Sequence, residues 1–146
     1  MFRLYSKRCE HAIRALTYLR RDNGTKRFKA ETLCRRAHVP EPATRKVFQA
    51  LASEGFLGAV RGPGGGYELI RDPSEITLLN IIMTVEGESV YADCVLGLRE
   101  CDATMPCPLH NFWLEARTVL MDQLESTTLE ELIATRERRS KKRKRK

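Results

Sequence analysis

Three cysteines and a histidine stand close together in residues 94–110, CVLGLRECDATMPCPLH, which we call the cysteine segment. Thiolate sulfur and imidazole nitrogen are the protein ligands that soft and borderline metals prefer. Six residues separate Cys94 from Cys101, five separate Cys101 from Cys107, and His110 lies three positions beyond Cys107. These gaps are wider than the Cys-x2–4-Cys spacing of most structural zinc sites. Taken alone, the four residues leave open an iron–sulfur cluster, a zinc site, and a redox switch or inert thiols.

The total cysteine content favours a reducing compartment. The chain has five cysteines, an odd number for a disulfide framework, and neither end carries an apolar run of signal-peptide length. No stretch approaches the roughly 20 apolar residues that cross a bilayer. We therefore expect a soluble, cytoplasmic protein without a membrane partner. Cys9 and Cys34 fall on the apolar faces of expected helices, which predicts buried structural thiols.

Two amphipathic helices must position the cysteine segment. One apolar repeat predicts a helix over residues 78–86 that stops at Gly87, and a second repeat from Leu109 to Leu124 predicts a long helix. The apolar stripe of the long helix is wider than one small domain needs, which indicates a partner helix.

The first half of the chain has the pattern of a winged helix-turn-helix. Apolar spacing predicts a helix over residues 6–21 with Ser6 as N-cap, a short helix around residues 30–37, and a third helix over residues 42–55. The strand-like stretches FLGAV and YELI flank RGPGGG, which predicts a β-hairpin with a glycine-rich tip, the wing. The expected fold is mostly α with a small β-hairpin: a winged helix-turn-helix followed by a long helix.

Charge divides the chain into three parts. Residues 1–71 carry a balance of +9, residues 72–135 of −10, and residues 136–146 of +8. We expect a winged helix-turn-helix DNA-binding domain over residues 1–72 and a second part, with the cysteine segment and its flanking helices, over residues 73–135. Residues 136–146 should form a disordered basic tail that attracts phosphate nonspecifically.

The basic first half predicts a double-stranded DNA partner. The early turns of the third helix would reach base edges in the major groove, and the wing would contact the minor groove. Solvated basic faces on a protein-interaction domain are the alternative. The candidate DNA-binding residues are Arg8, Arg35, Arg36, Thr44, Arg45, Lys46, Arg61, Gly62, Gly64 and Gly65.

Several motifs occur in the order seen in one family of bacterial regulators. The motifs are MFRLYSKRCEHAIRALTYL, VRGPGGGYEL, ITLLNIIMTVEG, the three cysteines of the cysteine segment and TLEEL. Through them the chain resembles the Rrf2 family, with its IscR-, NsrR- and RirA-like iron–sulfur sensors, over residues 1 to about 135. The resemblance implies a homodimeric winged-helix transcription regulator, a repressor or a dual regulator. Its long dimerisation helix would pair the subunits, and residues 73–135 would hold the cluster-binding loop and the dimerisation helices. An enzyme is not expected, because the chain contains no evident nucleophile–base or acid–base constellation.

The resemblance also implies a cofactor. In IscR-like members three cysteines and a histidine hold a [2Fe–2S] cluster, and the matching residues here are Cys94, Cys101, Cys107 and His110. The spacing departs from that pattern by one extra residue between the first two cysteines. NsrR-like members hold a [4Fe–4S] cluster with an acidic residue of the other subunit, the position of the partner's Glu10.

The sequence leaves open the nuclearity of the cluster, its fourth ligand and the signal it senses (iron, redox state or nitric oxide). It also leaves open the operator sequence and whether the cluster-loaded or the cluster-free form binds DNA. A cluster-free regulator controlled by thiol oxidation or a partner protein is the alternative, and an electron-transfer or cluster-delivery protein is a third class.

Overall fold

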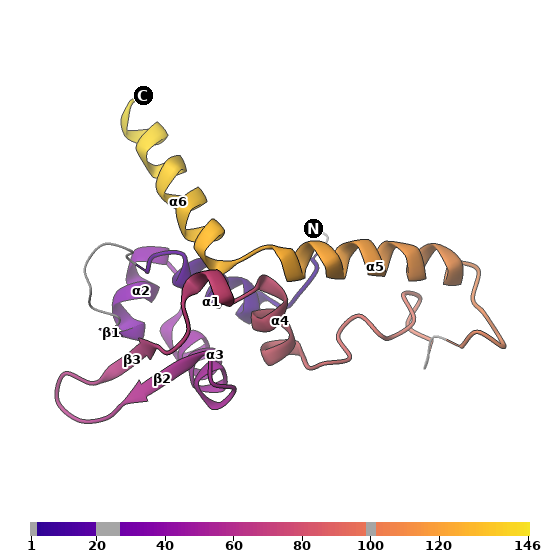
Figure 1. Ribbon diagram of the computed structural model, residues 1–146, viewed down its shortest axis with the longest axis horizontal. Helices are drawn as coiled ribbons and strands as arrows, with labels where there is room; N and C mark the ends of the chain where they lie inside the picture. The colour runs from indigo at the N-terminus through magenta and orange to yellow at the C-terminus, as the bar shows by residue number, and fades with distance from the viewer. Residues whose placement is uncertain (1–2, 20–26, 99–101) are drawn as a thin grey trace.

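The computed structural model describes residues 3–19, 27–98 and 102–146. These residues form six α-helices, one short 3-10 helix and a three-stranded antiparallel sheet (Figure 1). The prediction of a mostly helical fold with a small β-hairpin is confirmed. Among the helices of the described ranges, none is long and apolar enough to cross a bilayer.

Three helices form the helix-turn-helix part: α1 (Lys7–Leu16), α2 (Ala30–Ala37) and α3 (Glu41–Ser53). Ser6 caps α1 as predicted, because its hydroxyl accepts a hydrogen bond from the N–H of Cys9 at 3.4 Å. The helix is shorter than expected. Its last turns tighten into bonds from Tyr18 N to Ala15 O and from Leu19 N to Leu16 O, so the α-helical ladder ends at Leu16.

The wing consists of β2 (Leu57–Val60) and β3 (Gly66–Leu69), which pair antiparallel as predicted. A third strand, β1 (Arg27–Phe28), pairs with the other edge of β3 and was not predicted. Two residues are too short for an alternating pattern, and packing positions this strand instead. The ring of Phe28 stacks on Tyr67 at 5.9 Å and meets Phe48 edge-on at 5.8 Å.

The second half begins with a 3-10 turn, η1 (Pro73–Glu75), followed by α4 (Leu78–Glu86). A capping box between Thr77 and Asn80 fixes the start of α4. After α4 the chain leads outward, and it then turns back into the N-terminus of α5 (His110–Ser126), which returns toward α6 (Leu129–Lys144) (Figure 1). The two helices that flank the cysteine segment are therefore those expected.

The basic tail differs from the prediction. Residues 136–144 are not disordered but continue α6 (Leu129–Lys144). Three features outweigh the repulsion between the basic side chains. A capping box joins Thr128 and Glu131 at the N-terminus, the buried Leu129 and Ile133 anchor the first turns in the core, and four basic residues occupy the last turn, where cations favour the helix dipole.

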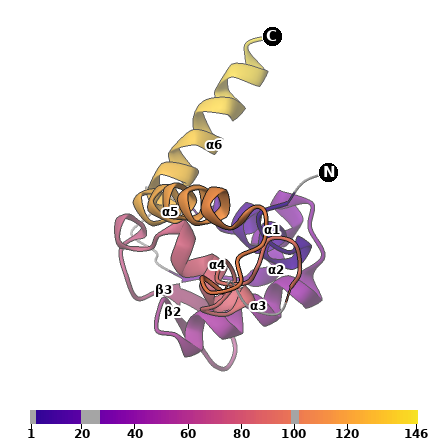
Figure 2. The same cartoon turned by 90° about the vertical axis from the view of Figure 1, so that its right-hand side faces the viewer.

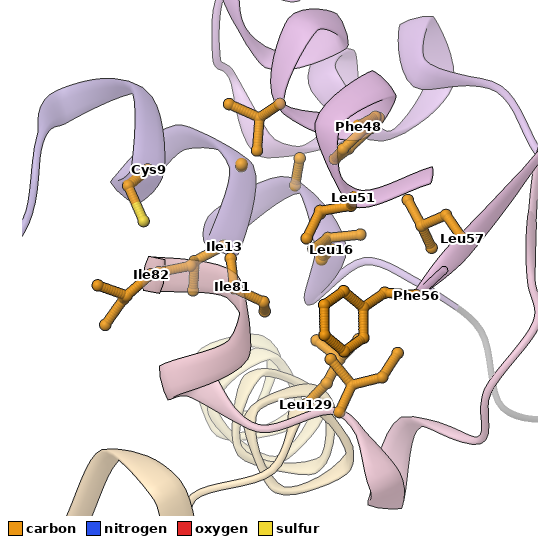
Figure 3. Close-up of a cluster of buried hydrophobic side chains, with 14 of the residues drawn as sticks. Cys9, Ile13, Leu16, Phe48, Leu51, Phe56, Leu57, Ile81, Ile82 and Leu129 are labelled. Atoms are coloured by element: carbon orange, nitrogen blue, oxygen red, sulfur yellow. The ribbon is translucent and has the colours of Figure 1, made fainter. Parts of the chain in front are cut away.

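One hydrophobic core joins both halves of the chain (Figure 3). Phe48 and Leu51 of α3 are fully buried with Ile81 of α4 and Leu129 of α6. The proposed boundary after residue 72 stays a prediction, but the core crosses it without a break. Movement of α4 or of the base of α6 would therefore be transmitted directly to α3.

Candidate DNA interface and cysteine site

The structure brings two of the predicted metal ligands together. The Sγ atoms of Cys94 and Cys107 lie 3.7 Å apart. Cys94 is 7% exposed and Cys107 is half-buried. Cys101 falls outside the described residues. Within the described part of the chain, no group of three or more His, Cys, Asp or Glu side chains has the arrangement of a metal site.

The residues just before the cysteine segment are hydrogen-bonded to α5 and to the chain just before α1. The indole N–H of Trp113 on α5 donates to Asp93 O at 3.1 Å, and Arg117 on the same helix donates to Tyr91 O at 3.3 Å. The hydroxyl of Tyr91 donates to Leu4 O, just before α1, at 2.8 Å. Cys94 is therefore held at a fixed place between α5 and the N-terminal end of α1.

Local hydrogen bonds favour the thiolate form of Cys94. The backbone N–H of Leu96 is the main cause that lowers the pKa of this thiol, with further contributions from Cys107 and the backbone of Leu98. Thiolates are the form that binds metals and attacks oxidants, and hydrogen bonds to sulfur are a common feature of cluster sites.

The other two described thiols have the opposite character. Burial raises the pKa of Cys9 to about 12 and also raises that of Cys34, and the two residues are 0% and 2% exposed. Both lie in the core on helix faces, as predicted for structural thiols. The contrast in pKa separates Cys94 from Cys9 and Cys34.

The spacing of the two sulfurs suits a metal. Two thiolates bound at about 2.3 Å to one tetrahedral metal lie about 3.8 Å apart. The 3.7 Å between Cys94 and Cys107 matches this value. A disulfide requires about 2.05 Å, so a further approach of the two sulfurs would also permit oxidation. The donor set fits an iron–sulfur cluster and fits a dithiol pair.

The two candidates for a fourth ligand differ in position. His110 is the first residue of α5, is 8% exposed, and its backbone N–H donates to Cys107 O at 3.0 Å, so its backbone is fixed next to that of Cys107. Glu10 lies on α1, where ion pairs with Lys7 at 3.1 Å and Arg14 at 3.8 Å hold it. The hydrogen bond from Lys7 is the main cause that lowers the pKa of Glu10.

The third helix exposes basic side chains on its early turns. Arg45 and Lys46 are exposed next to Ala43, and Arg45 pairs with Glu41 one turn earlier. Thr44 departs from the prediction. Its side chain is 0% exposed and its hydroxyl donates to Pro40 O at 2.7 Å, so it cannot reach a base edge. Helical spacing places Thr44 with the buried Val47 and Phe48 rather than with its basic neighbours.

The wing presents Arg61 at the start of the turn that joins β2 to β3, with an exposed side chain; it lies next to the tip rather than at the base of the wing. Gly62 and Gly64 adopt φ of 90° and 73°, a region that L side chains rarely enter. At Gly65, a Cβ atom would lie 2.4 Å from Val60 O, and the N–H of Gly65 donates to Gly62 O at 2.9 Å. The glycines are thus required by the turn itself, and between them the tip carries only the ring of Pro63.

The three remaining candidates are exposed but differently engaged. Arg8 donates to Val85 O, at the C-terminal end of α4, at 3.0 Å. This contact joins α1 to α4 and gives Arg8 a structural role that its charge did not reveal. Arg35 pairs with Glu31 at 3.6 Å, and both Arg35 and Arg36 are exposed at the end of α2.

Sequence reasoning missed the contacts that link α1 to the second half. The carboxylate of Glu86 accepts hydrogen bonds from the backbone N–H of Ser6 at 2.9 Å and from its hydroxyl. With the bonds from Arg8 and Tyr91, three contacts tie the start of α1 to α4 and the cysteine segment. No spacing rule could find them, because the partners are about 80 residues apart.

The fold agrees with comparisons to known proteins. The family model "Rrf2: Iron-dependent Transcriptional regulator" matches residues 5–135. A protein of Aquifex aeolicus named as an HTH-type transcriptional regulator is 31% identical over 137 residues, which cover 92% of this chain and 94% of that protein. The regulator IscR of Photorhabdus laumondii is 37% identical over 92 residues, 63% of this chain and 56% of IscR.

Solved structures show the same fold. CymR, the global cysteine regulator of B. subtilis, superposes with a TM-score of 0.73 at 23% identity, over 92% of this chain and 98% of CymR. IscR of T. potens superposes with a TM-score of 0.65 at 20% identity, over 89% of this chain and 85% of IscR. The relatives and the matching family are transcription regulators and not enzymes.

Proposed function

Since the chain belongs to the Rrf2 family of transcriptional regulators, we propose that it is a repressor whose operator binding is controlled by an iron–sulfur cluster. The observation that carries this proposal is the distance of 3.7 Å between the Sγ atoms of Cys94 and Cys107. The chain just before Cys94 is hydrogen-bonded, through Tyr91, to Leu4 at the start of α1. The cluster would report iron supply, redox state or nitric oxide.

The operator would be bound by α3 and the wing. Arg45 and Lys46 on the exposed face of α3 suit guanine edges and phosphates of the major groove. Arg61 suits the narrow minor groove beside it, and the missing side chains of Gly62 and Gly64 let the backbone of the wing tip approach the sugar–phosphate wall. Arg35 and Arg36 would contact phosphates, together with Gly65 of the wing and with Arg8 if it leaves Val85 O. The buried Thr44 has no place in this interface.

The cluster would be held by Cys94, Cys101 and Cys107. His110, buried at the start of α5 next to Cys107, is the preferred fourth ligand, which corresponds to a [2Fe–2S] cluster. The partner's Glu10 is the second choice and corresponds to a [4Fe–4S] cluster. When bound, the cluster supplies a redox-active, oxygen- and nitric-oxide-sensitive link between these side chains.

The chain's own contacts would carry the signal to α3. Tyr91 is hydrogen-bonded to Leu4, and Glu86 to Ser6. The position of α1 therefore depends on the position of the chain that leads from α4 into the cysteine segment. Helices α1 and α3 pack directly against each other in the core. A shift of α1 would therefore change the orientation of α3, and operators with half-sites about one helical turn apart tolerate little change.

A homodimer would present the two recognition helices. The side chains of Phe112 and Val119 on α5 are 65% and 70% exposed. Leu109, which precedes the first residue of this helix, is exposed as well. Such large apolar groups on one helix favour burial against a second copy of the chain. This arrangement would make the second half, residues 73–135, the dimerisation part.

The specific alternative is control by thiol oxidation without a cluster. Cys94 and Cys107 are close enough that a small movement would let them form a disulfide, with loss of two protons and two electrons to an oxidant such as a peroxide. The favoured thiolate of Cys94 supports this candidate as well.

Anaerobic purification separates the two candidates. We expect a coloured protein with iron and acid-labile sulfide in equal amounts, and a different footprint on its promoter before and after the iron is removed. A colourless protein without iron after anaerobic reconstitution would refute the cluster. If its operator affinity then changes with a peroxide, the disulfide candidate stands.

A further inference from the structure

A basic groove lies between α1 and α6, away from α3 and the wing. Its volume is about 680 Å³, and α1 lines it with Arg14, Thr17 and Tyr18. The side chains that α6 contributes recur every three to four residues and so form one face of that helix: Leu132, Thr135, Arg136, Arg139, Ser140, Arg143 and Lys144. Among the described residues that line the groove, five are cationic and none is acidic.

Two of the cations hold the groove in shape. The Nε of Arg136 donates to Thr17 O at 2.9 Å, and its guanidinium lies 4.5 Å from the ring centre of Tyr18. Because Thr17 follows the last turn of α1, this cation also meets the negative end of the helix dipole. Arg14 likewise donates to Ala37 O, at the end of α2, at 2.9 Å.

The other cations make no such anchoring contact, although Arg143 and Lys144 stand in the last turn of α6, where their charge favours the helix dipole. No hydrogen bond or ion pair joins Arg139, Arg143 or Lys144 to another described residue, and Lys144 and Arg143 are exposed. The hydroxyls of Ser140 and Thr135 lie on the same face of α6. Guanidinium, ammonium and hydroxyl groups in one groove are the set that proteins use to bind the phosphates of a nucleic acid.

The groove is distant from the DNA-binding face of the same protomer. In Figure 1, α6 rises from the top of the molecule, whereas α3 and the strands β2 and β3 lie at the bottom. Figure 2 is turned about the vertical axis and shows the same order, so the vertical separation is real. One straight duplex held by α3 and the wing would not reach this groove.

We propose that the groove between α1 and α6 binds the phosphate backbone of a second DNA segment, so that the regulator holds two duplexes at once. The positive charge of residues 136–146 continues along α6 for several turns, which suits the closely spaced charges of a duplex. A lipid surface is less suited, because α6 exposes no large apolar side chain. The proposal is independent of any cluster.

The test compares two triple variants of the full-length protein. In R139Q/R143Q/K144Q the three substitutions lie in the groove, whereas in R138Q/K141Q/K142Q they lie on the other faces of α6. Each variant loses three positive charges, and Arg136 is left in place because it anchors the helix. Equal helix content by circular dichroism, for both variants and wild type, is the control for folding.

The assay measures capture of a second duplex. Protein is loaded onto an immobilised operator fragment, and binding of a free, fluorescent duplex of unrelated sequence is titrated at several salt concentrations. We expect the groove variant to lose this capture on the order of 10²-fold near 0.1 M salt, with a salt slope smaller by about 2.7. The control variant should lose less than tenfold, and both variants should bind a single short operator duplex as wild type does.

Three results would overturn the proposal. Equal losses in the two variants would mean that the overall charge of α6 acts, not the groove. A lower affinity of the groove variant for the single short operator would mean that both basic surfaces contact one duplex. Displacement of the fluorescent duplex by polyglutamate as efficiently as by unlabelled DNA would indicate an acidic protein partner. Operator binding by wild type in the same assay tests the proposed function separately.

Discussion

The hydroxyl of Tyr91 offers a direct test of the path from the cysteine segment to α1. Tyr91 is 7% exposed, and its hydroxyl donates to Leu4 O at 2.8 Å. Burial is the main cause that raises its pKa to about 12, so the hydroxyl stays protonated and donates at neutral pH. In the variant Tyr91→Phe the ring is kept, but the partly buried carbonyl of Leu4 loses its partner.

The expected cost follows from that single contact. A hydrogen bond of this kind contributes about 0.5–1.5 kcal/mol, and an unsatisfied carbonyl adds to the loss, so the free energy of unfolding should fall by about 1–2 kcal/mol. Urea denaturation measures this change. Because the start of α1 is then less firmly held, the ratio of operator affinities between the cluster-loaded and stripped forms should also move toward one.

A matched control is Tyr18→Phe. The hydroxyl of Tyr18 donates to none of the residues that the structure describes, while its ring lies beneath Arg136. We expect this variant to have the stability and the affinity ratio of wild type. If Tyr91→Phe is destabilised but its affinity ratio is unchanged, the contact is structural only and the proposed path is refuted.

Three further predictions concern local features of the fold. His38 ends α2 in the left-handed region, with φ 54° and ψ 51°. Because glycine adopts this conformation without strain, His38→Gly should raise the free energy of unfolding by about 0.5 kcal/mol, and a lower melting temperature would contradict this. Leu129 is 1% exposed, so Leu129→Ala should cost about 2–5 kcal/mol in urea, whereas the half-buried Leu132 should cost less when changed to Ala; equal losses would mean that α6 is not anchored by Leu129. With the pKa of Cys9 near 12 and that of Cys34 raised, both buried thiols should resist iodoacetamide at pH 8 in the native apoprotein, as checked by peptide mass mapping; rapid labelling of either would contradict their burial.

Much of the fold follows from local rules. Apolar spacing locates α2, α3, α4 and α5, the hydroxyl of Ser6 marks the start of α1, and the glycine run marks the wing. The strand β1 could not be predicted, because Phe28 is positioned by rings from α3 and β3 rather than by its neighbours in sequence. The tail was misjudged because its composition suggested repulsion, while capping at Thr128 and burial of Leu129 decide its structure.

The candidate site is predictable in part for the same reason. Residue type and order single out the cysteine segment, and the structure brings Cys94 and Cys107 together. The burial of Thr44 depends on which face of α3 meets the core, and its polar side chain gave no sign of it. The contacts of Glu86 and Tyr91 with the start of α1 depend on tertiary packing, which no local pattern in the sequence records.

The most direct test of cluster control is the operator affinity of two cysteine variants, measured anaerobically before and after iron is removed. Cys107→Ala removes a proposed ligand, and Cys34→Ala removes a buried thiol of the core. We predict that Cys107→Ala has the affinity of the stripped wild-type protein under both conditions, whereas Cys34→Ala keeps the wild-type ratio between the two forms. A Cys107→Ala protein whose affinity changes with iron removal as much as that of wild type would contradict control through this site.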